Sequence, residues 1–116
     1  MPVFHLREAG MSDVLLVLTT LPDAESAHGL ATALVEARVA ACVNLLPQCS
    51  SIYRWEGKVE SASEVLLLIK TRADGYDALE AAIRSRHPYE LPEIVAVPVV
   101  RGLPDYLRWV AAESAA

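Results

Sequence analysis

The hydrophobic residues of this chain follow two different spacings. Branched, mostly apolar runs predict four β-strands, at residues 14–20, 41–46 continued by 50–55, 58–72 and 94–100. The second strand is interrupted near Pro47, where a bulge or an edge position is expected. The dipeptide Glu56-Gly57 follows, and it predicts a tight hairpin turn into the third strand.

Apolar residues at helical spacing fill the gaps between these strands. Asp23 is the predicted N-cap of a first helix, which begins at Ala24 and places on one face Ala27, Leu30, Ala31, Leu34 and Val35. Asp74 is the predicted cap of a second helix, whose shared face consists of Tyr76, Leu79, Ala82 and Ile83. Gly102 ends the last strand, and a third helix is predicted at 103–112, with one side made of Leu103, Leu107 and Val110.

The predicted order is strand, helix, strand, strand, helix, strand and a final helix. A βαββαβ order is typical of the α+β ferredoxin-like sandwich, in which an antiparallel sheet carries its helices on one face. The sequence thus predicts this fold with an extra C-terminal helix, in a single domain at residues 13–113. Residues 1–12 are expected to form a flexible N-terminal extension, and residues 114–116 a short tail.

The strands carry more apolar residues than this architecture covers in one subunit. An antiparallel sheet with one wet face should alternate apolar and polar side chains. Val14–Leu18, Val65–Ile69 and Ile94–Val97 are instead apolar at both phases, and 53% of all residues are hydrophobic. Two medium helices and one short helix cannot cover both faces, so an oligomer whose sheets pack together is predicted. The alternative is a monomer with an exposed apolar face.

Charge and composition argue against several classes of function. The net charge is −5 and the basic residues are scattered, which makes nucleic acid and anionic membranes poor partners. No apolar run is long enough to span a bilayer. With only two cysteines, Cys42 and Cys49, the chain does not resemble a disulfide-rich secreted domain, and a cytoplasmic location is expected. The chain has no phosphate loop, nucleophile elbow or HExxH motif, so it is expected not to be an enzyme.

The heptapeptide HPYELPE at 87–93 contains an imidazole, a phenol, two carboxylates and two prolines. His87 is a candidate ligand for Cu(II) or Zn(II), which favour nitrogen donors. The alternative is a histidine that is hydrogen-bonded at the end of the second helix. Pro88 and Pro92 restrict the residues before them, so the loop is expected to be rigid. A rigid loop suits a binding cleft and a purely structural role equally well.

Two neighbouring strands offer a second set of candidate residues. Tyr53 and Trp55 share one face of the second strand, while Glu64 opens and Lys70 ends the apolar part of the third. This arrangement predicts an aromatic wall with a charge at each end. The alternative is that the charged residues are solvated strand ends and the aromatic rings pack at an interface.

Longer motifs connect the chain with a known family. They are TTLPDAESA at 19–27, LVEARVAACVN at 34–44, SSIYRWEGKVE through EVLLLIKT at 51–71, HPYELPEIVAVPV at 87–99 and YLRWV at 106–110. By these motifs the chain resembles the CutA family of divalent-cation tolerance proteins, over nearly everything from Asp13 to Val110. The resemblance implies a ferredoxin-like subunit in a tight homotrimer whose three sheets pack together.

The resemblance also suggests a ligand. Copper binding has been attributed to members of the family, and no catalytic activity is established for it. Members credited with copper binding carry a cysteine where this chain has Thr19, and a pair of histidines where it has Arg86 and His87. Only His87 remains of that set, so copper or another divalent metal is expected to bind weakly and not to be required.

CutA trimers also resemble the PII signal proteins, which bind small effectors in clefts between subunits. By that likeness, a small anionic ligand is expected in an intersubunit cleft lined by Tyr53, Trp55, Glu64, Lys70, Tyr89 and Glu93. Three functions therefore stay open: a trimer for divalent-cation tolerance, a PII-like effector-binding module, and a scaffold that binds other proteins.

Overall fold

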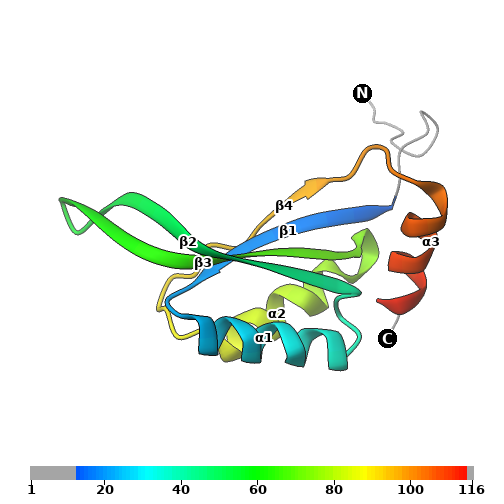
Figure 1. The fold of residues 1–116 in the computed structure, drawn as a ribbon, viewed down its shortest axis with the longest axis horizontal. Helices are drawn as coiled ribbons and strands as arrows, with labels where there is room; N and C mark the ends of the chain where they lie inside the picture. Colours follow the sequence, from blue (N-terminus) through cyan, green and yellow to red (C-terminus); the bar gives the residue numbers. More distant parts are fainter. Residues whose placement is uncertain (1–12, 115–116) are drawn as a thin grey trace.

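Within residues 13–114, which the structure describes, four strands form one antiparallel sheet in the order β2-β3-β1-β4 (Figure 1). The structure is a computed structural model, and the predicted extension 1–12 lies outside the described residues, as does the end of the predicted tail. The strands are β1 (Val14–Leu21), β2 (Cys42–Trp55), β3 (Lys58–Arg72) and β4 (Val95–Pro98). Helices α1 and α2 cover one face of this sheet. The predicted α+β, ferredoxin-like architecture is confirmed.

β2 and β3 form a long hairpin whose tip projects well beyond the helices (Figure 1). The pairing of these strands shifts between Leu46 and Cys49, and Gln48 has a left-handed φ of 64°, so the expected bulge is present. Glu56 and Gly57 have φ of 50° and 82°, the left-handed pair of a two-residue hairpin turn. The bulge and the turn thus occur where the sequence predicts them.

α1 (Ala24–Glu36) begins as predicted. The carboxylate of Asp23 accepts a hydrogen bond from the backbone N–H of Ser26 at 2.7 Å, which satisfies one of the free donors at the helix start. The same bond lowers the pKa of Asp23, because it stabilises the ionised carboxylate. Glu25 lies in the first turn, where the helix dipole favours an anion.

α2 (Tyr76–Arg86) begins differently from the prediction. A short 3₁₀ turn, η2 (Ala73–Gly75), precedes it, and no side chain caps it. The prediction that Asp74 caps this helix is wrong, because its carboxylate instead pairs with the guanidinium of Arg72 through two hydrogen bonds, at 3.0 and 2.8 Å. A bidentate contact with a charged donor outcompetes a single capping bond to a backbone N–H.

α3 (Pro104–Glu113) lies apart from the other helices, at the end of the sheet opposite the hairpin tip (Figure 1). Val110 packs with Val14 and Ala41 in a small separate cluster. The prediction that Leu103 lies on the buried side is wrong, since this residue precedes the helix and is 70% exposed. Proline at the start of α3 sets the first helical turn one residue later than predicted.

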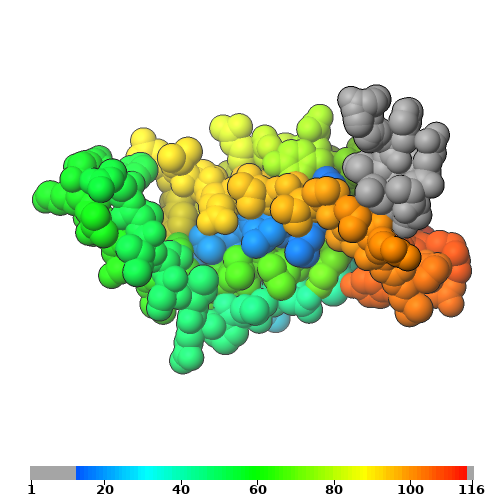
Figure 2. Space-filling view, turned by 90° about the horizontal axis from the view of Figure 1, so that it is seen from above, coloured from blue at the N-terminus to red at the C-terminus, as the bar shows by residue number. Residues whose placement is uncertain are grey.

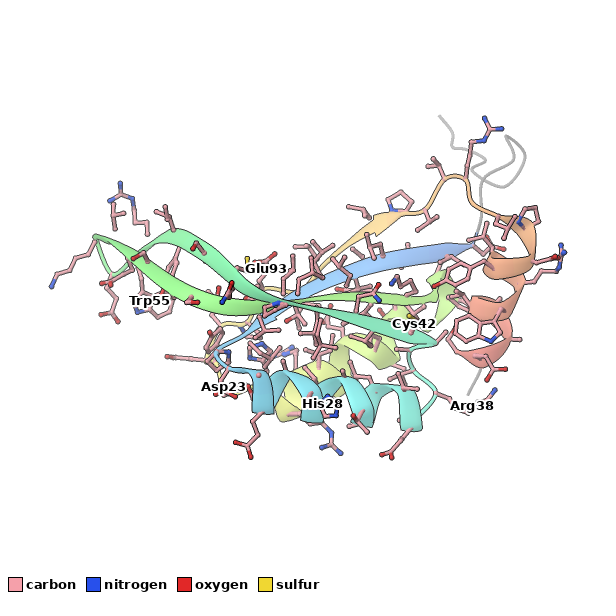
Figure 3. The ribbon with its side chains drawn as sticks, viewed as in Figure 1. Asp23, His28, Arg38, Cys42, Trp55 and Glu93 are labelled. Carbon is pink, nitrogen blue, oxygen red and sulfur yellow. The ribbon has the colours of Figure 1, made fainter. Side chains whose placement is uncertain are left out.

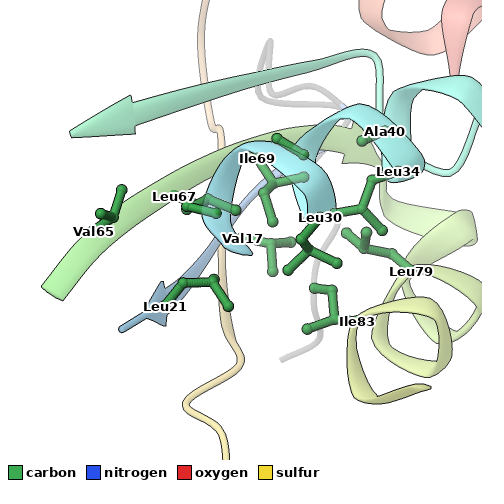
Figure 4. Close-up of a cluster of buried hydrophobic side chains, with 12 residues drawn as sticks. Val17, Leu21, Leu30, Leu34, Ala40, Val65, Leu67, Ile69, Leu79 and Ile83 are labelled. Atoms are coloured by element: carbon green, nitrogen blue, oxygen red, sulfur yellow. The ribbon is translucent and has the colours of Figure 1, made fainter. Parts of the chain in front are cut away.

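The main core lies between the sheet and helices α1 and α2 (Figure 4). Alternate residues of β3 face this layer, as the period of a strand requires. The buried members are Val17, Leu21, Ala27, Leu30, Ala31, Leu34, Ala40, Val65, Leu67, Ile69, Leu79 and Ile83. This set contains the predicted faces of the first two helices except for Val35, Tyr76 and Ala82 at their edges.

The opposite face of the sheet, which we call the open face, has no covering layer in the described subunit (Figure 2), except at one end, where α3 packs against Val14 and Val99. Val95 and Val97 of β4 are 48% and 46% exposed, and Leu46 of β2 is also exposed. Their chain neighbours Ile94 and Leu45 pack against the core on the helix side. The strands are therefore apolar at both phases, as the sequence indicates, and one subunit covers only one of the two faces.

Shortening Leu67 tests the contribution of the central strands to stability. Leu67 is fully buried, so Leu67→Ala removes buried methyl groups and leaves a cavity. We expect the free energy of unfolding to fall by about 2–5 kcal/mol in chemical denaturation. Leu103→Ala is the control at an exposed position, where a change within about 0.5 kcal/mol is expected. Equal losses in the two variants would contradict this description of the core.

Candidate functional site

A groove of about 870 Å³ separates the outer half of the β2–β3 hairpin from the segment that links α2 to β4. The hairpin extends past β1, because β1 pairs with β3 only as far as Leu21 and Val65. Figure 2 shows the hairpin tip and the linking segment as separate lobes at one end of the molecule. We call this space the hairpin groove; it is lined by Thr20, Ser51, Ile52, Tyr53, Arg54, Trp55, Glu64 and residues 88–93.

His87 fastens the linking segment to the end of the sheet. It ends α2, and its Nε2 bonds to the backbone carbonyl of Thr20 at 2.8 Å. Its Nδ1 accepts a hydrogen bond from the backbone N–H of Tyr89 at 3.1 Å. These two bonds require a neutral ring with its proton on Nε2. Burial lowers the pKa of His87 accordingly, against the opposing effects of the Thr20 carbonyl and the Glu64 charge.

Tyr89 connects the linking segment to the hairpin. Its hydroxyl donates to Oε2 of Glu64 at 2.5 Å, across 25 positions of sequence. Burial raises the pKa of Tyr89, and the hydrogen bond to the Glu64 carboxylate raises it further, so the phenol keeps its proton. Glu64 itself is only 8% exposed. A continuous series of hydrogen bonds thus runs from β1 through His87 and Tyr89 to β3.

Acidic side chains outnumber basic ones around the hairpin groove. The lining contains three carboxylates, those of Glu64, Glu90 and Glu93, against the single guanidinium of Arg54. Tyr53 and Trp55, which are 45% and 41% exposed, add aromatic rings from the hairpin. The lining therefore favours a cation over the small anion that the likeness to PII proteins implies.

Five of the six predicted cleft residues meet in this groove: Tyr53, Trp55, Glu64, Tyr89 and Glu93. Lys70 does not join them within one subunit, so its place in a cleft between subunits stays a prediction. It pairs with Cys42, which lies at the other end of the sheet from Trp55 (Figure 3). The ammonium of Lys70 there contacts Asn44 and lies 3.8 Å from the Cys42 sulfur. Within one subunit, the apolar part of β3 thus holds Glu64 and Lys70 apart at its two ends.

Two charged residues of the groove, Arg54 and Glu90, were not among the predicted cleft residues. Arg54 lies between Tyr53 and Trp55 in the strand, so strict alternation assigns it to the other face. Glu90 is one of two carboxylates in HPYELPE, and no periodicity separates it from Glu93. The available signal that Arg54 and Glu90 matter is that both belong to the motifs that carry the family resemblance.

Within residues 13–114, no three or more His, Cys, Asp or Glu side chains are grouped so as to hold a metal ion. A metal on Nδ1 of His87 has to displace the N–H of Tyr89. Such a neutral hydrogen bond contributes only about 1 kcal/mol net, so this competition alone does not prevent binding. Thr19 is fully buried, and Arg86 has no lone pair to offer. Metal binding at His87 therefore stays a prediction, and it needs donors from outside one subunit.

Residues 15–113 match the family model for the CutA1 divalent ion tolerance protein. The chain belongs to the CutA1 family. The divalent-cation tolerance protein CutA of Thermus thermophilus is 47% identical over 95 residues, which cover 82% of this chain and 92% of that protein. The crystal structure of CutA from Xylella fastidiosa superimposes with a TM-score of 0.87 at 47% identity, and covers 90% of this chain and all of that one. The family recognised from the sequence motifs is thus confirmed.

Other CutA relatives are longer than this chain. Protein CutA of Mus musculus is 50% identical over 97 residues, which are 84% of this chain but 55% of the mouse protein. The chain thus spans about half the length of its vertebrate relatives.

Acid should destabilise the folded protein through His87. Because burial lowers its pKa below the ordinary 6.5, the unfolded chain binds a proton more readily than the folded one. The contribution of this residue to stability is complete above about pH 6.5 and is lost as the pH falls towards the folded pKa. We expect the thermal midpoint to fall less in His87→Gln than in the wild type between about pH 7 and pH 5.

His28→Gln is the control, since His28 is exposed on α1 and makes no contact with the groove. It should keep the wild-type pH dependence. The same pH slope in His87→Gln and the wild type would contradict the structural role given to this imidazole.

Proposed function

We propose that the protein acts in divalent-cation tolerance as a homotrimer that binds copper or another divalent metal ion and catalyses no reaction. The open face of the sheet is the observation that carries this proposal. Its apolar residues, among them Val95 and Val97, are nearly half exposed in the single subunit. Burying about 100 Å² of apolar surface contributes about 2.5 kcal/mol, so covering this face in three subunits stabilises the assembly strongly.

A trimer also supplies what one subunit lacks for a metal site. His87 offers one imidazole, and Glu90 and Glu93 are the carboxylates that follow it in the linking segment. A tightly held transition metal needs three or four such donors, which the described part of one subunit does not group together. Assembly of three copies brings further donors within reach. Weak binding is expected because His87 first gives up a hydrogen bond.

The hairpin groove supports a second candidate function, the binding of a small effector as in PII-like proteins. Segments distant in sequence converge on it, and the side chains of Tyr53, Trp55 and Tyr89 are gathered at its walls. Concave surfaces with aromatic rings and a few polar groups are where small ligands bind. A neighbouring subunit would close such a groove further.

A cytoplasmic location completes the proposal. Within residues 13–114, no helix has the length and apolar character needed to cross a membrane. The two cysteines described, Cys42 and Cys49, are both free thiols. Reduced thiols are typical of the cytoplasm.

The assembly is tested by light scattering coupled to size exclusion. The wild type should have a mass three times the 12.6 kDa of one chain at micromolar concentration. Val97→Glu places a charge on the open face, and we expect it to reduce the mass or abolish folding. Val35→Glu is the matched control, because Val35 is similarly exposed, at 42%, but on α1. A monomeric wild type, or equal effects of the two variants, would refute the proposed packing of sheets.

Metal binding is tested by calorimetric titration of Cu(II) into the metal-free protein. We expect weak binding in the wild type and at least a tenfold loss of affinity in His87→Ala, which corresponds to about 1.4 kcal/mol. His28→Ala removes an exposed imidazole elsewhere and should bind like the wild type. Equal affinities in all three proteins would rule out His87 as a ligand.

A further inference from the structure

Glu64 is a largely buried acid whose carboxylate accepts a single hydrogen bond from the described residues. It is 8% exposed, and Oε2 accepts one hydrogen bond, from the neutral hydroxyl of Tyr89. Within residues 13–114, no basic side chain forms an ion pair with it, and Oε1 accepts no hydrogen bond. Buried carboxylates are normally paired with a cation or bonded to several donors, because removing a charge from water is costly.

The position of Glu64 shows where a compensating charge would come from. The residue lines the hairpin groove, at the point where β3 leaves its partner β1. The other acids of the lining, Glu90 and Glu93, lie in the linking segment opposite. A positive group entering the groove therefore meets carboxylates on both walls.

Aromatic rings line the same space. Tyr53 and Trp55 belong to the hairpin wall, and Tyr89 to the linking segment. The first two remain about half exposed in the subunit, although large aromatic side chains are usually buried. The faces of such rings attract cations, and several rings around one space are typical of sites for alkylated ammonium groups.

We propose that the hairpin groove binds an organic ammonium ion, with its positive nitrogen against Glu64 and its alkyl groups against Tyr53, Trp55 and Tyr89. This inference rests on the effector-binding function proposed above and replaces the expected small anion with a cation. The hydrogen bond from Tyr89 holds the carboxylate of Glu64 in place and leaves Oε1 for the ligand.

The size and chemistry of the groove favour an organic cation over a bare metal ion. A divalent ion such as Ca²⁺ or Mg²⁺ requires about six oxygen ligands closely spaced around it. The described residues contain no such group, whereas the groove has about 870 Å³ of space. Arg54, the one cation in the lining, is outnumbered by three carboxylates.

Calorimetric titration of choline into the full-length protein tests the inference. The neutral comparison is 3,3-dimethylbutan-1-ol, which has the same shape with carbon in place of the quaternary nitrogen. We expect choline to bind at least tenfold more tightly than this alcohol. Equal affinities, or no binding of choline, would overturn the proposal, because the positive charge would then contribute nothing.

Glu64→Gln identifies the residue responsible, since it removes the charge and keeps an acceptor for Tyr89. We expect at least a tenfold weaker affinity for choline in this variant. Glu60→Gln is the matched control: it changes the net charge equally, on the same strand, at an exposed position outside the lining, and should bind as the wild type does. Equal weakening of choline binding in both variants would mean that net charge, and not Glu64 itself, sets the affinity, and it would overturn the assignment.

Trp55→Leu provides a second test that does not disturb the buried carboxylate. Loss of the ring should weaken choline severalfold and leave the alcohol nearly unaffected. An unchanged ratio of the two affinities would overturn the role of the aromatic wall. If the wild type binds phosphate or a nucleotide but not choline, effector binding survives and this inference fails. If it binds none of them, both fail.

Discussion

The sheet of this protein is apolar on both faces, and its own helices cover only one of them. α1 and α2 meet Leu67 and its neighbours on the covered face, while Val95 and Val97 remain half exposed on the other. Stability of a domain is typically about 5–15 kcal/mol, so several uncovered side chains of this size are a large fraction of it. This constraint explains why a small chain carries so many hydrophobic residues, and it underlies the proposal that subunits pack sheet against sheet.

A second constraint arises where the chain leaves α2. The neutral ring of His87 donates to the backbone carbonyl of Thr20 near the end of β1 and accepts from the backbone N–H of Tyr89, whose hydroxyl donates to Glu64. Prolines on both sides of the segment limit its conformations, so few bonds suffice to hold it. The wall of the groove is therefore positioned by polar contacts to the sheet, and its stability depends on the neutral state of the His87 imidazole.

Local signals predicted most of the fold. The strands β1 to β3, the cap at Asp23 and the hairpin turn depend on neighbouring residues and appear as expected. β4 is shorter than its apolar run of 94–100: four residues pair in register with β1, and the N–H of Val99 also donates to the carbonyl of Val14. Asp74 failed as a cap because a nearby guanidinium competes for it. Aromatic and acidic residues of the groove were recognised individually, but no local pattern reveals that Tyr89 and Glu64 are hydrogen-bonded.

The hairpin groove lies between the outer half of the β2–β3 hairpin and the segment that links α2 to β4. The outer half of the hairpin is held mainly by pairing between β2 and β3, beyond the reach of β1. The bond between Tyr89 and Glu64 attaches the linking segment to its base. A ligand that engages Glu64 from one wall and rings from both adds a further attachment, and any ligand that binds only the folded state stabilises it. Binding and hairpin order are thus expected to be coupled, because the carboxylate that bonds to Tyr89 also lines the groove.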